Sequence, residues 1–293
     1  MKNWLGFLLV LLAATGCEKT VDFDLNENQP KLVVEATIEN GQTPMVVLSQ
    51  SLNYFSTINP QLLASSFVHN ADVFVSNGTK THKLKEYSYN VSPDYKIYYY
   101  SVDSSNLSSA FVGELSKQYS LRILYNGKEY TANTTIPNVT KRVDSLWWKP
   151  APANADTTKV VAMVRVTDPS GFGDYARYFT KRNREPFYPP LASAFDDLVI
   201  DGTTYELQVD AGVNRNIERE EDERLFNKGD TVVFKLCNID KVTFDFWRTM
   251  EYSYNSIGNP FATPVKVLSN ISNSGLGYFG GYAAQYHTLV IPK

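Results

Sequence analysis

Apolar and polar residues alternate along the first half of the chain. In residues 31–39 (KLVVEATIE) and 119–136 (YSLRILYNGKEYTANTTI), apolar side chains recur at every second position, and β-branched and aromatic residues are common. This period of two predicts strands with one buried and one polar face. Asn77-Gly78 and Asn126-Gly127 mark turns, because an Asn-Gly pair readily adopts the positive φ of a tight hairpin. Strands at this spacing predict an antiparallel, immunoglobulin-like β-sandwich over residues 31–140.

The second half of the chain repeats the strand pattern more loosely. Residues 159–167 and 230–239 have the composition of strands, and residues 168–171 (DPSG) have that of a turn. We therefore expect a mainly β protein with two domains. The sandwich occupies residues 31–140, and a second β-rich domain with one short helix occupies residues 141–293.

One segment has a helical pattern. Residues 241–255 (KVTFDFWRTMEYSYN) repeat apolar side chains at intervals of three and four residues. Val242, Phe246, Thr249 or Met250, and Ser253 fall on the side that we expect to be buried, and Phe244 extends its apolar surface. Asp240 stands directly before the segment and is the expected N-cap.

The first 17 residues have the pattern of a lipoprotein signal. Lys2 supplies a positive charge, residues 5–12 are an apolar run, and small residues directly precede Cys17. We expect residues 1–16 to be a signal peptide, Cys17 to carry a membrane-bound lipid and residues 17–30 to be a polar tether. The expected location is the outer membrane, with the cell surface favoured over the periplasmic face. The alternative is an ordinary secreted protein in which the cysteine has no special role.

Composition narrows the function classes. The chain has 43% hydrophobic residues and a formal net charge of −3. These values fit a folded protein and argue against a nucleic-acid partner, since a phosphate-binding surface normally has a basic excess. The two cysteines, Cys17 and Cys237, leave no disulfide framework and no cysteine-based zinc site. Cys237 lies in an apolar strand pattern, where we expect a buried thiol.

No residue pattern specifies catalysis or a cofactor. His69, His82 and His287 lie in separate segments, and the chain has no P-loop, GxSxG or dinucleotide-binding motif. We therefore expect a protein that is not an enzyme and needs no cofactor. An acid-pair hydrolase remains an alternative, because two carboxylates that are distant in sequence can meet in space.

One acidic group is a weak candidate for a metal site. Asp196 and Asp197 lie close to Asp201 in the sequence, and carboxylate oxygens are ligands that suit Ca²⁺. Their spacing lacks the alternating acids of a calcium loop, so we expect no metal there.

Aromatic residues are abundant and supply the candidate binding surface. The chain has 19 Tyr, 16 Phe and 4 Trp, and exposed aromatic rings favour carbohydrate stacking and protein interfaces. Alternation along a strand places neighbouring rings on opposite faces, so some are expected at the surface. The alternative is that these rings pack between the two domains. The candidates are Tyr98, Tyr100, Trp147, Trp148, Arg182, Arg184, Phe187 and Tyr188.

Several motifs resemble a known protein family. In the second half they are Asn238-Ile239-Asp240, Asn259-Pro260-Phe261 and residues 275–282 (GLGYFGGY). The first half agrees more loosely, through residues 17–19 (CEK) and 70–73 (NADV). These residues resemble the DUF4249 family of Bacteroidetes lipoproteins over essentially the whole mature chain. The resemblance implies an outer-membrane lipoprotein with an immunoglobulin-like N-terminal domain, encoded beside TonB-dependent receptors, and it brings no catalytic residues.

Together these features predict a non-enzymatic lipoprotein that serves as an accessory subunit of an outer-membrane β-barrel, a TonB-dependent nutrient transporter. The expectation of a β-barrel partner comes from the family resemblance. The aromatic residues supply the alternative, which is a free-standing surface module that binds a glycan or a peptide.

Overall fold

The computed structural model describes residues 29–293 except for positions 54–55, 93–94, 153–155, 216–223 and 264. The predicted signal peptide, Cys17 and most of the predicted tether lie outside the described residues.

Strands make up most of the regular structure, so the fold is mainly β, as predicted. The sequence analysis does not predict the helix over Pro60–Ser66 (α2), whose N-cap is Asn59. The helices are α2 (Pro60–Ser66), the short 3-10 helix η1 (Leu107–Ser109) and α3 (Lys241–Asn255). The strands are β1 (Leu32–Glu39), β2 (Met45–Gln50), β3 (Asp72–Ser76), β4 (Thr81–Ser92), β5 (Tyr95–Val102), β6 (Lys117–Tyr125), β7 (Lys128–Ile136), β8 (Arg142–Pro150), β9 (Lys159–Thr167), β10 (Tyr175–Arg182), β11 (Ala194–Phe195), β12 (Thr204–Val209), β13 (Phe226–Asn227), β14 (Thr231–Ile239) and β15 (Leu276–Val290).

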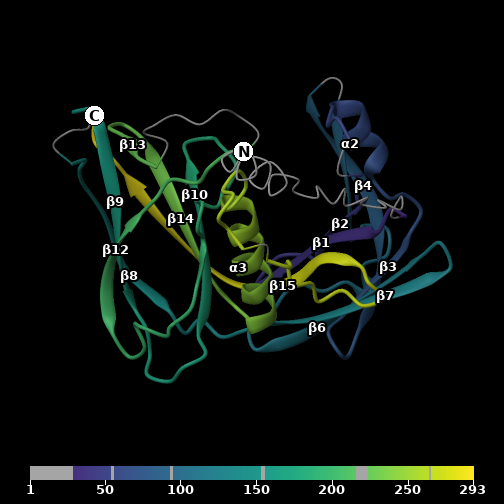
Figure 1. The fold of residues 1–293 in the computed structure, drawn as a ribbon. Coiled ribbons are helices and arrows are strands. Elements are labelled where there is room, and N and C mark those ends of the chain that lie inside the picture. The colour runs from purple at the N-terminus through teal and green to yellow at the C-terminus, as the bar shows by residue number, and fades with distance from the viewer. Residues whose placement is uncertain (1–28, 54–55, 93–94, 153–155, 216–223, 264) are drawn as a thin grey trace, which may run out of the picture.

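The described strands form one large and one small sheet (Figure 1). The large sheet has the order β11-β10-β14-β15-β1-β2-β5-β4-β3-β6-β7. In the small sheet, β8, β12 and β13 all pair with β9. The N-terminal strands of the large sheet curl until β7 lies against β15, while its C-terminal strands pack on the small sheet. The curled N-terminal half is consistent with the sandwich that the sequence predicts for residues 31–140, and the two packed sheets lie in the C-terminal half, which the sequence predicts only as β-rich.

Strand β15 lies in the middle of the large sheet and joins its two halves. Up to Tyr282 it pairs in parallel with β1, and from Tyr282 onward it pairs antiparallel with β14. Each half of β15 therefore has one edge without a neighbouring strand. The side chain of Asn270 bonds the N–H and C=O of Phe279, and Asn40 does the same for Ala284. These amides satisfy backbone groups that would otherwise lack a partner.

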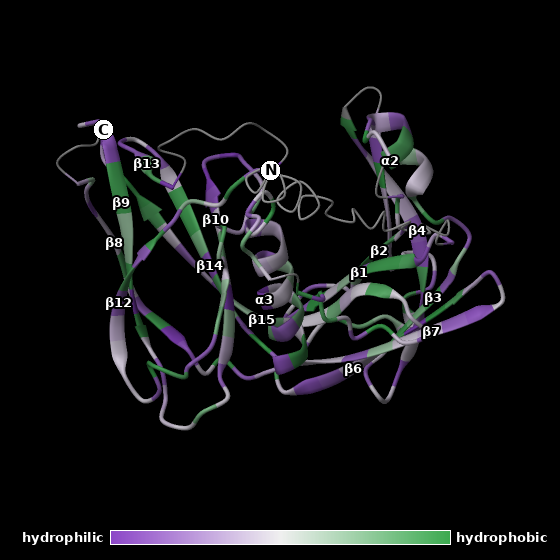
Figure 2. Cartoon of the chain, viewed as in Figure 1, coloured by the Kyte–Doolittle hydropathy of each residue, from purple (hydrophilic) through white to green (hydrophobic). Residues whose placement is uncertain are grey.

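Three clusters of buried side chains form the core. The first core fills the curled N-terminal half, where Val34 and Ile38 of β1 meet β3, β6 and β7. Strand β15 contributes Phe279 and Ala283 to it. The second core lies between the two sheets, and the third lies between α3 and the other face of β10, β14 and β15. In Figure 2, β1 and β9 are coloured largely as apolar, in agreement with their place in these cores.

The segment that connects the two halves is fastened to the end of β14. The side chain of Asn238 accepts a hydrogen bond from the Lys141 N–H at 2.9 Å. One carboxylate oxygen of Asp240 accepts from the Thr134 hydroxyl at 2.9 Å and from the Thr135 N–H at 2.8 Å. The large sheet is continuous across this segment, and the division into two domains there stays a prediction.

The predicted helix is confirmed as α3, and Asp240 caps it by accepting a bond from the Thr243 N–H at 2.9 Å. The predicted buried side is wrong in part. Val242 and Met250 are 43% and 36% exposed, whereas Thr243 and Glu251 are buried. Apolar periodicity does not reveal a carboxylate that is buried because a neighbouring loop donates hydrogen bonds to it.

Substitution of Gly281 tests the close contact between β15 and β7. A Cβ atom at this position would lie 2.5 Å from the Thr135 carbonyl oxygen, so one of the two strands would have to move. We expect Gly281→Ala to lower the free energy of unfolding by about 1–3 kcal/mol, measured by urea denaturation. The control is Thr288, which is exposed on the same strand. Thr288→Ala should change the free energy of unfolding by less than about 0.5 kcal/mol. An unchanged unfolding midpoint for Gly281→Ala would contradict the contact.

Candidate ligand-binding groove

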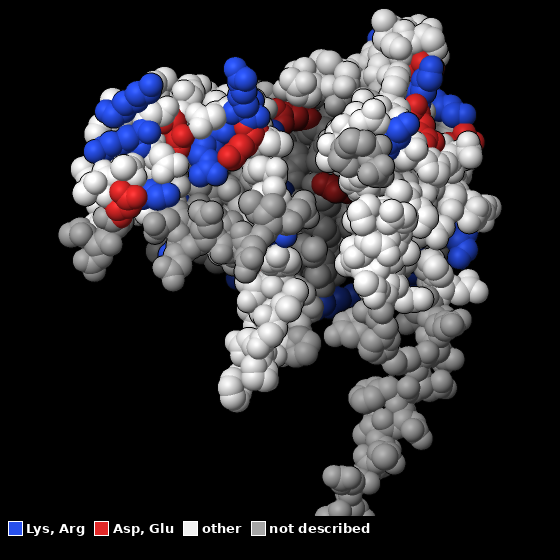
Figure 3. All heavy atoms as spheres, turned by 90° about the horizontal axis from the view of Figure 1, so that it is seen from above, with Lys and Arg blue, Asp and Glu red and all other residues white. Residues whose placement is uncertain are grey.

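A groove lies between the two halves of the molecule. Figure 3 looks down on it and shows a surface that is hollowed between the halves, with acidic side chains at depth. Its floor is the face of β1 and β15 that points away from the first core. Helix α3 covers the neighbouring part of this face, and β4 and β5 rise on the other side.

One row of side chains crosses the groove along the strand pairing. Tyr278 of β15 pairs with Glu35 of β1, which pairs with Val47 of β2. The antiparallel register of β2 and β5 places Tyr99 beside Val47, and Tyr99 pairs with Tyr87 of β4. The rings of Tyr87 and Tyr99 stack with their centroids 5.8 Å apart. Because side chains alternate along a strand, the residues on either side of Glu35 fill the first core and Glu35 itself faces the groove.

Glu35 is a carboxylate without a partner in the described part of the chain. Among the described residues, it forms no hydrogen bond and no ion pair. Its side chain is exposed, yet the surrounding protein raises the pKa of its carboxyl group, and the charge of Arg177 only partly opposes this. Burial also raises the pKa of the Tyr89 and Tyr278 hydroxyls, and the charge of Glu35 adds to the effect. Exposure combined with a raised pKa fits a carboxylate that water reaches from one side only.

Other charged side chains on this face have partners. Lys235 of β14 bonds the carboxylate of Glu39. Arg177 of β10 stacks on Trp247 of α3, with its guanidinium carbon 3.3 Å from the ring centroid, and donates to the Ser193 hydroxyl at 2.8 Å. Glu35 differs from these groups because no cation or donor in the described part of the face bonds to it, although the charge of Arg177 acts on it.

The three consecutive tyrosines of β5, residues 98–100, do not all face the groove. Tyr100 is only 3% exposed, and its hydroxyl donates to the Val68 carbonyl at 3.1 Å. It therefore belongs to the first core and offers no binding surface. Tyr98 is half-buried and its ring packs 5.6 Å from that of Phe67. The ring that faces the groove is that of Tyr99, which lies between them.

The structure does not bring Trp147 and Trp148 to the groove. Both lie on β8 in the small sheet, which is separated from the groove face by the second core. Trp148 packs against that core, and Trp147 lies on the opposite face, with the Lys149 ammonium 5.6 Å from its ring centroid.

The predicted contact loop folds back along the end of β10. Tyr188 forms a backbone bridge to β10, and Arg182 forms an ion pair within the loop at 3.0 Å. Arg184 is exposed. Phe187 reaches the groove face, where the Lys235 ammonium lies 5.7 Å from its ring centroid.

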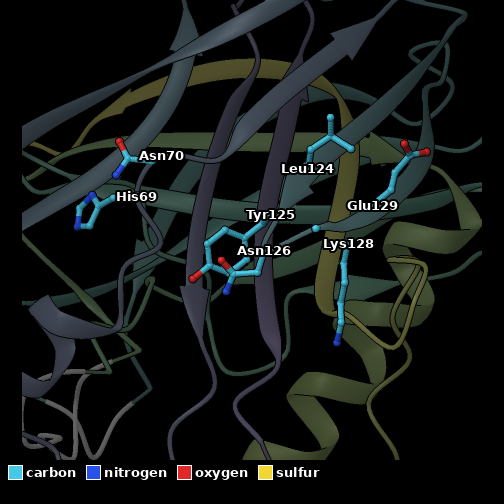
Figure 4. Close-up of a pocket in the computed structure, with 8 residues that line it drawn as sticks. His69, Asn70, Leu124, Tyr125, Asn126, Lys128 and Glu129 are labelled. Carbon is cyan, nitrogen blue, oxygen red and sulfur yellow. The ribbon is translucent and has the colours of Figure 1, made fainter.

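A second hollow of about 710 Å³ lies at the turn between β6 and β7. Figure 4 shows that the side chains around it point in different directions. His69 is bonded to Glu86 at 2.5 Å, and Tyr125 accepts a bond from Gln50 at 2.9 Å. The Asn126-Gly127 pair is the predicted hairpin turn. This hollow has no converging set of polar groups of the kind that marks a binding site.

The structure separates the three acids that the sequence singles out. Asp197 and Asp201 lie together, and Asp168 joins them, with one carboxylate oxygen from each residue within 4.8 Å of the others. We name these three residues the aspartate cluster. Asp196 points elsewhere and forms an ion pair with Arg248 at 3.5 Å.

Comparison with known proteins identifies the family. The family model described as "Domain of unknown function (DUF4249)" matches residues 18–287. The chain belongs to the DUF4249 family. No curated protein matches this DUF4249 protein. Within its described residues, no helix is both long and apolar enough to cross a membrane.

Sequence reasoning did not single out Glu35 in this DUF4249 protein. Glu35 and Glu39 occupy equivalent polar positions in the alternating pattern of β1, and no local feature distinguishes them. The distinction comes from Lys235, which lies 196 residues from Glu39 along the chain and bonds to it. The sequence reasoning came nearest to the groove through Tyr98 and Tyr100, and the density of tyrosines in residues 87–100 is a signal that could have extended it.

Glu35 gives the DUF4249 protein a testable pH dependence. The folded protein raises the pKa of this carboxyl above its ordinary value of 4.5, so folding disfavours the ionised form. The resulting stabilisation is fully present below the unfolded pKa and is lost as the pH rises through the raised pKa. We therefore expect Glu35→Gln to raise the Tm near neutral pH and to leave it unchanged near pH 4, measured by scanning calorimetry.

The control for this measurement is Glu129→Gln, which alters an exposed acid of β7. It should change the Tm at neither pH. An equal rise for both variants, or a rise for Glu35→Gln at the acidic pH as well, would contradict the raised pKa.

Proposed function

We propose that this protein is a lipid-anchored, non-enzymatic binding protein of the outer membrane whose groove receives a ligand at Glu35. The observation that carries this proposal is the carboxylate of Glu35, which has no partner among the described residues and lies in a row with Tyr99 and Tyr87. A carboxylate accepts hydrogen bonds from hydroxyl, amide or ammonium groups, and aromatic rings stack on apolar or cationic surfaces. A ligand with both donors and an apolar face is a saccharide or a peptide.

We further propose that the protein is an accessory subunit of an outer-membrane β-barrel, a TonB-dependent nutrient transporter. Two features support this role. One is the lipoprotein pattern before Cys17, and the other is that the family resemblance implies a protein encoded beside TonB-dependent receptors. A lipid at Cys17 confines the protein to the membrane, which raises its effective concentration beside a barrel in the same membrane. The groove would then present captured nutrient to the transporter.

A free-standing module that binds a glycan or a peptide is the second candidate. The stacked pair of Tyr87 and Tyr99 favours it, because ring stacking on a sugar or a peptide requires no further protein. An acid-pair hydrolase gains no support from Glu35. Glu39 is the next acid on the same strand face, and four residues of strand span roughly 13 Å. An acid pair in a glycosidase is separated by only about 5–9.5 Å.

Ligand binding in the groove is tested with the protein purified in detergent. Glycan and peptide arrays identify a ligand, and titration calorimetry then measures its affinity. We expect Glu35→Gln and Tyr99→Ala each to weaken binding by about tenfold or more, the effect of removing one good polar or stacking contact. Glu129→Gln is the control and should bind like the wild type. Equal affinities for all variants would exclude the groove as the site.

The accessory role is tested by crosslinking in intact cells, followed by affinity purification and mass spectrometry. We expect one β-barrel to be recovered in stoichiometric amount with the wild type and lost with Cys17→Ala, because the lipid holds the two proteins in one membrane. Recovery of no barrel with the wild type would contradict the accessory role and would leave the free-standing module.

A further inference from the structure

The aspartate cluster lies apart from the row of side chains that crosses the groove. Asp168 directly follows β9, and Asp197 and Asp201 come from the loop between β11 and β12. The Asp168 N–H donates to the Thr203 carbonyl at 2.9 Å, which fastens the two loops together. Residues from distant parts of the sequence thus converge on one small volume.

The charges in this volume do not balance. The Lys141 ammonium lies 2.5 Å from one oxygen of Asp168, and both side chains are fully buried. Lys141 is also the cation whose charge acts on Asp197. Among the described residues, no cation forms an ion pair with Asp197 or Asp201. Asp168 and Asp197 are buried and Asp201 is half-buried, so Lys141 leaves part of this negative charge unpaired, and a divalent cation would neutralise it.

Two buried oxygen atoms at the cluster have no partner within the described residues. The second carboxylate oxygen of Asp168 is enclosed and makes no hydrogen bond. The hydroxyl oxygen of Tyr205 is also enclosed and unbonded. Burial raises the pKa of that hydroxyl, and the nearby charge of Asp168 adds to the rise. Buried polar atoms are nearly always bonded, so these two atoms point to a ligand.

Backbone groups hold the other two carboxylates in place. One oxygen of Asp197 accepts from the Gly173 and Asp174 N–H groups at 2.7 and 2.9 Å. One oxygen of Asp201 accepts from the Gly171 N–H at 2.6 Å. In both residues the second oxygen makes no hydrogen bond to a described residue, so it is available to a ligand.

We propose that Asp168, Asp197 and Asp201 bind one divalent cation and that Ca²⁺ is the preferred ion. Oxygen ligands without nitrogen or sulfur favour Ca²⁺ or Mg²⁺ over transition metals. Ca²⁺ bonds its ligands at about 2.3–2.6 Å, so oxygens on opposite sides of it are roughly 4.6–5.2 Å apart. The cluster oxygens all lie within 4.8 Å of one another, so they are close enough together to bind one such ion. Mg²⁺ requires shorter bonds and stricter octahedral geometry.

The test is calorimetric titration of the detergent-purified protein with CaCl₂ after treatment with EGTA. We expect one site with a Kd of about 10⁻⁴ M, as in extracellular calcium modules, and a higher Tm in the presence of CaCl₂. Asp201→Asn retains an oxygen that can accept from Gly171 and removes one negative charge, so it should weaken binding at least tenfold. Asp196→Asn is the matched control, since Asp196 pairs with Arg248, and it should bind Ca²⁺ like the wild type.

A second measurement locates the ion. Tb³⁺ replaces Ca²⁺ in oxygen sites and emits when a nearby tyrosine is excited. We expect Tyr205→Phe to lose most of this emission, because it removes the phenol nearest to the cluster. Circular dichroism in EGTA establishes that each variant is folded, and Asp197→Asn replaces Asp201→Asn if the latter is not.

Two results would overturn the proposal. One is the absence of Ca²⁺ binding by the wild type up to about 10⁻² M, beyond the range of weak protein calcium sites. The other is an equal loss of binding in Asp201→Asn and Asp196→Asn. The first result would mean that water satisfies the enclosed oxygen atoms, and the second would mean that the ion does not bind at the aspartate cluster.

Discussion

The shared strand β15 is the constraint on which the rest of the structure depends. Its first half extends the sheet of the N-terminal half through β1, and its second half extends the C-terminal half through β14. It contributes Phe279 to the first core and Tyr278 to the third. It also lies so close to β7 that a side chain at Gly281 would collide with backbone. Because both halves are built on one strand, the groove between them has a fixed floor.

The position of α3 decides which part of that floor stays open. Asp240 caps the helix and also bonds Thr134 and Thr135 of β7, so the start of α3 is fixed at the junction of the two halves. Near its other end, Glu251 accepts hydrogen bonds from the N–H and hydroxyl of Ser193. These contacts hold α3 over β10 and β14. Glu35 on β1 therefore remains uncovered beside the tyrosines of β4 and β5.

The sequence predicts those features that depend on neighbouring residues. The strands, the Asn126-Gly127 turn and the helix with its Asp240 cap follow from periodicity and from turn and cap preferences. The buried positions of Tyr100 and Glu251 do not, because each depends on hydrogen bonds to residues from other elements. Periodicity shows only that apolar residues recur at a regular spacing, and it does not show which residues of other elements they contact.

The two candidate sites were hidden for the same reason. Glu35 and Glu39 are equivalent in the sequence of β1, and only the distant Lys235 distinguishes them. The acids near residue 197 were visible, but Asp168 joins them only because two loops meet. In both places the chemistry arises from contacts between segments that are far apart along the chain. A single sequence does not contain the register that brings them together.

The most direct measurement is hydroxyl-radical footprinting of the tyrosines, in the native membrane and again after purification. Tyr89, which is 51% exposed, and Tyr99 should be oxidised in the purified protein and protected in the membrane, because the groove is filled there. Tyr252 on α3, which is 48% exposed, is the internal reference and should react equally in both preparations. Equal oxidation of Tyr89 and Tyr99 in both preparations would contradict the claim that the groove is a binding site.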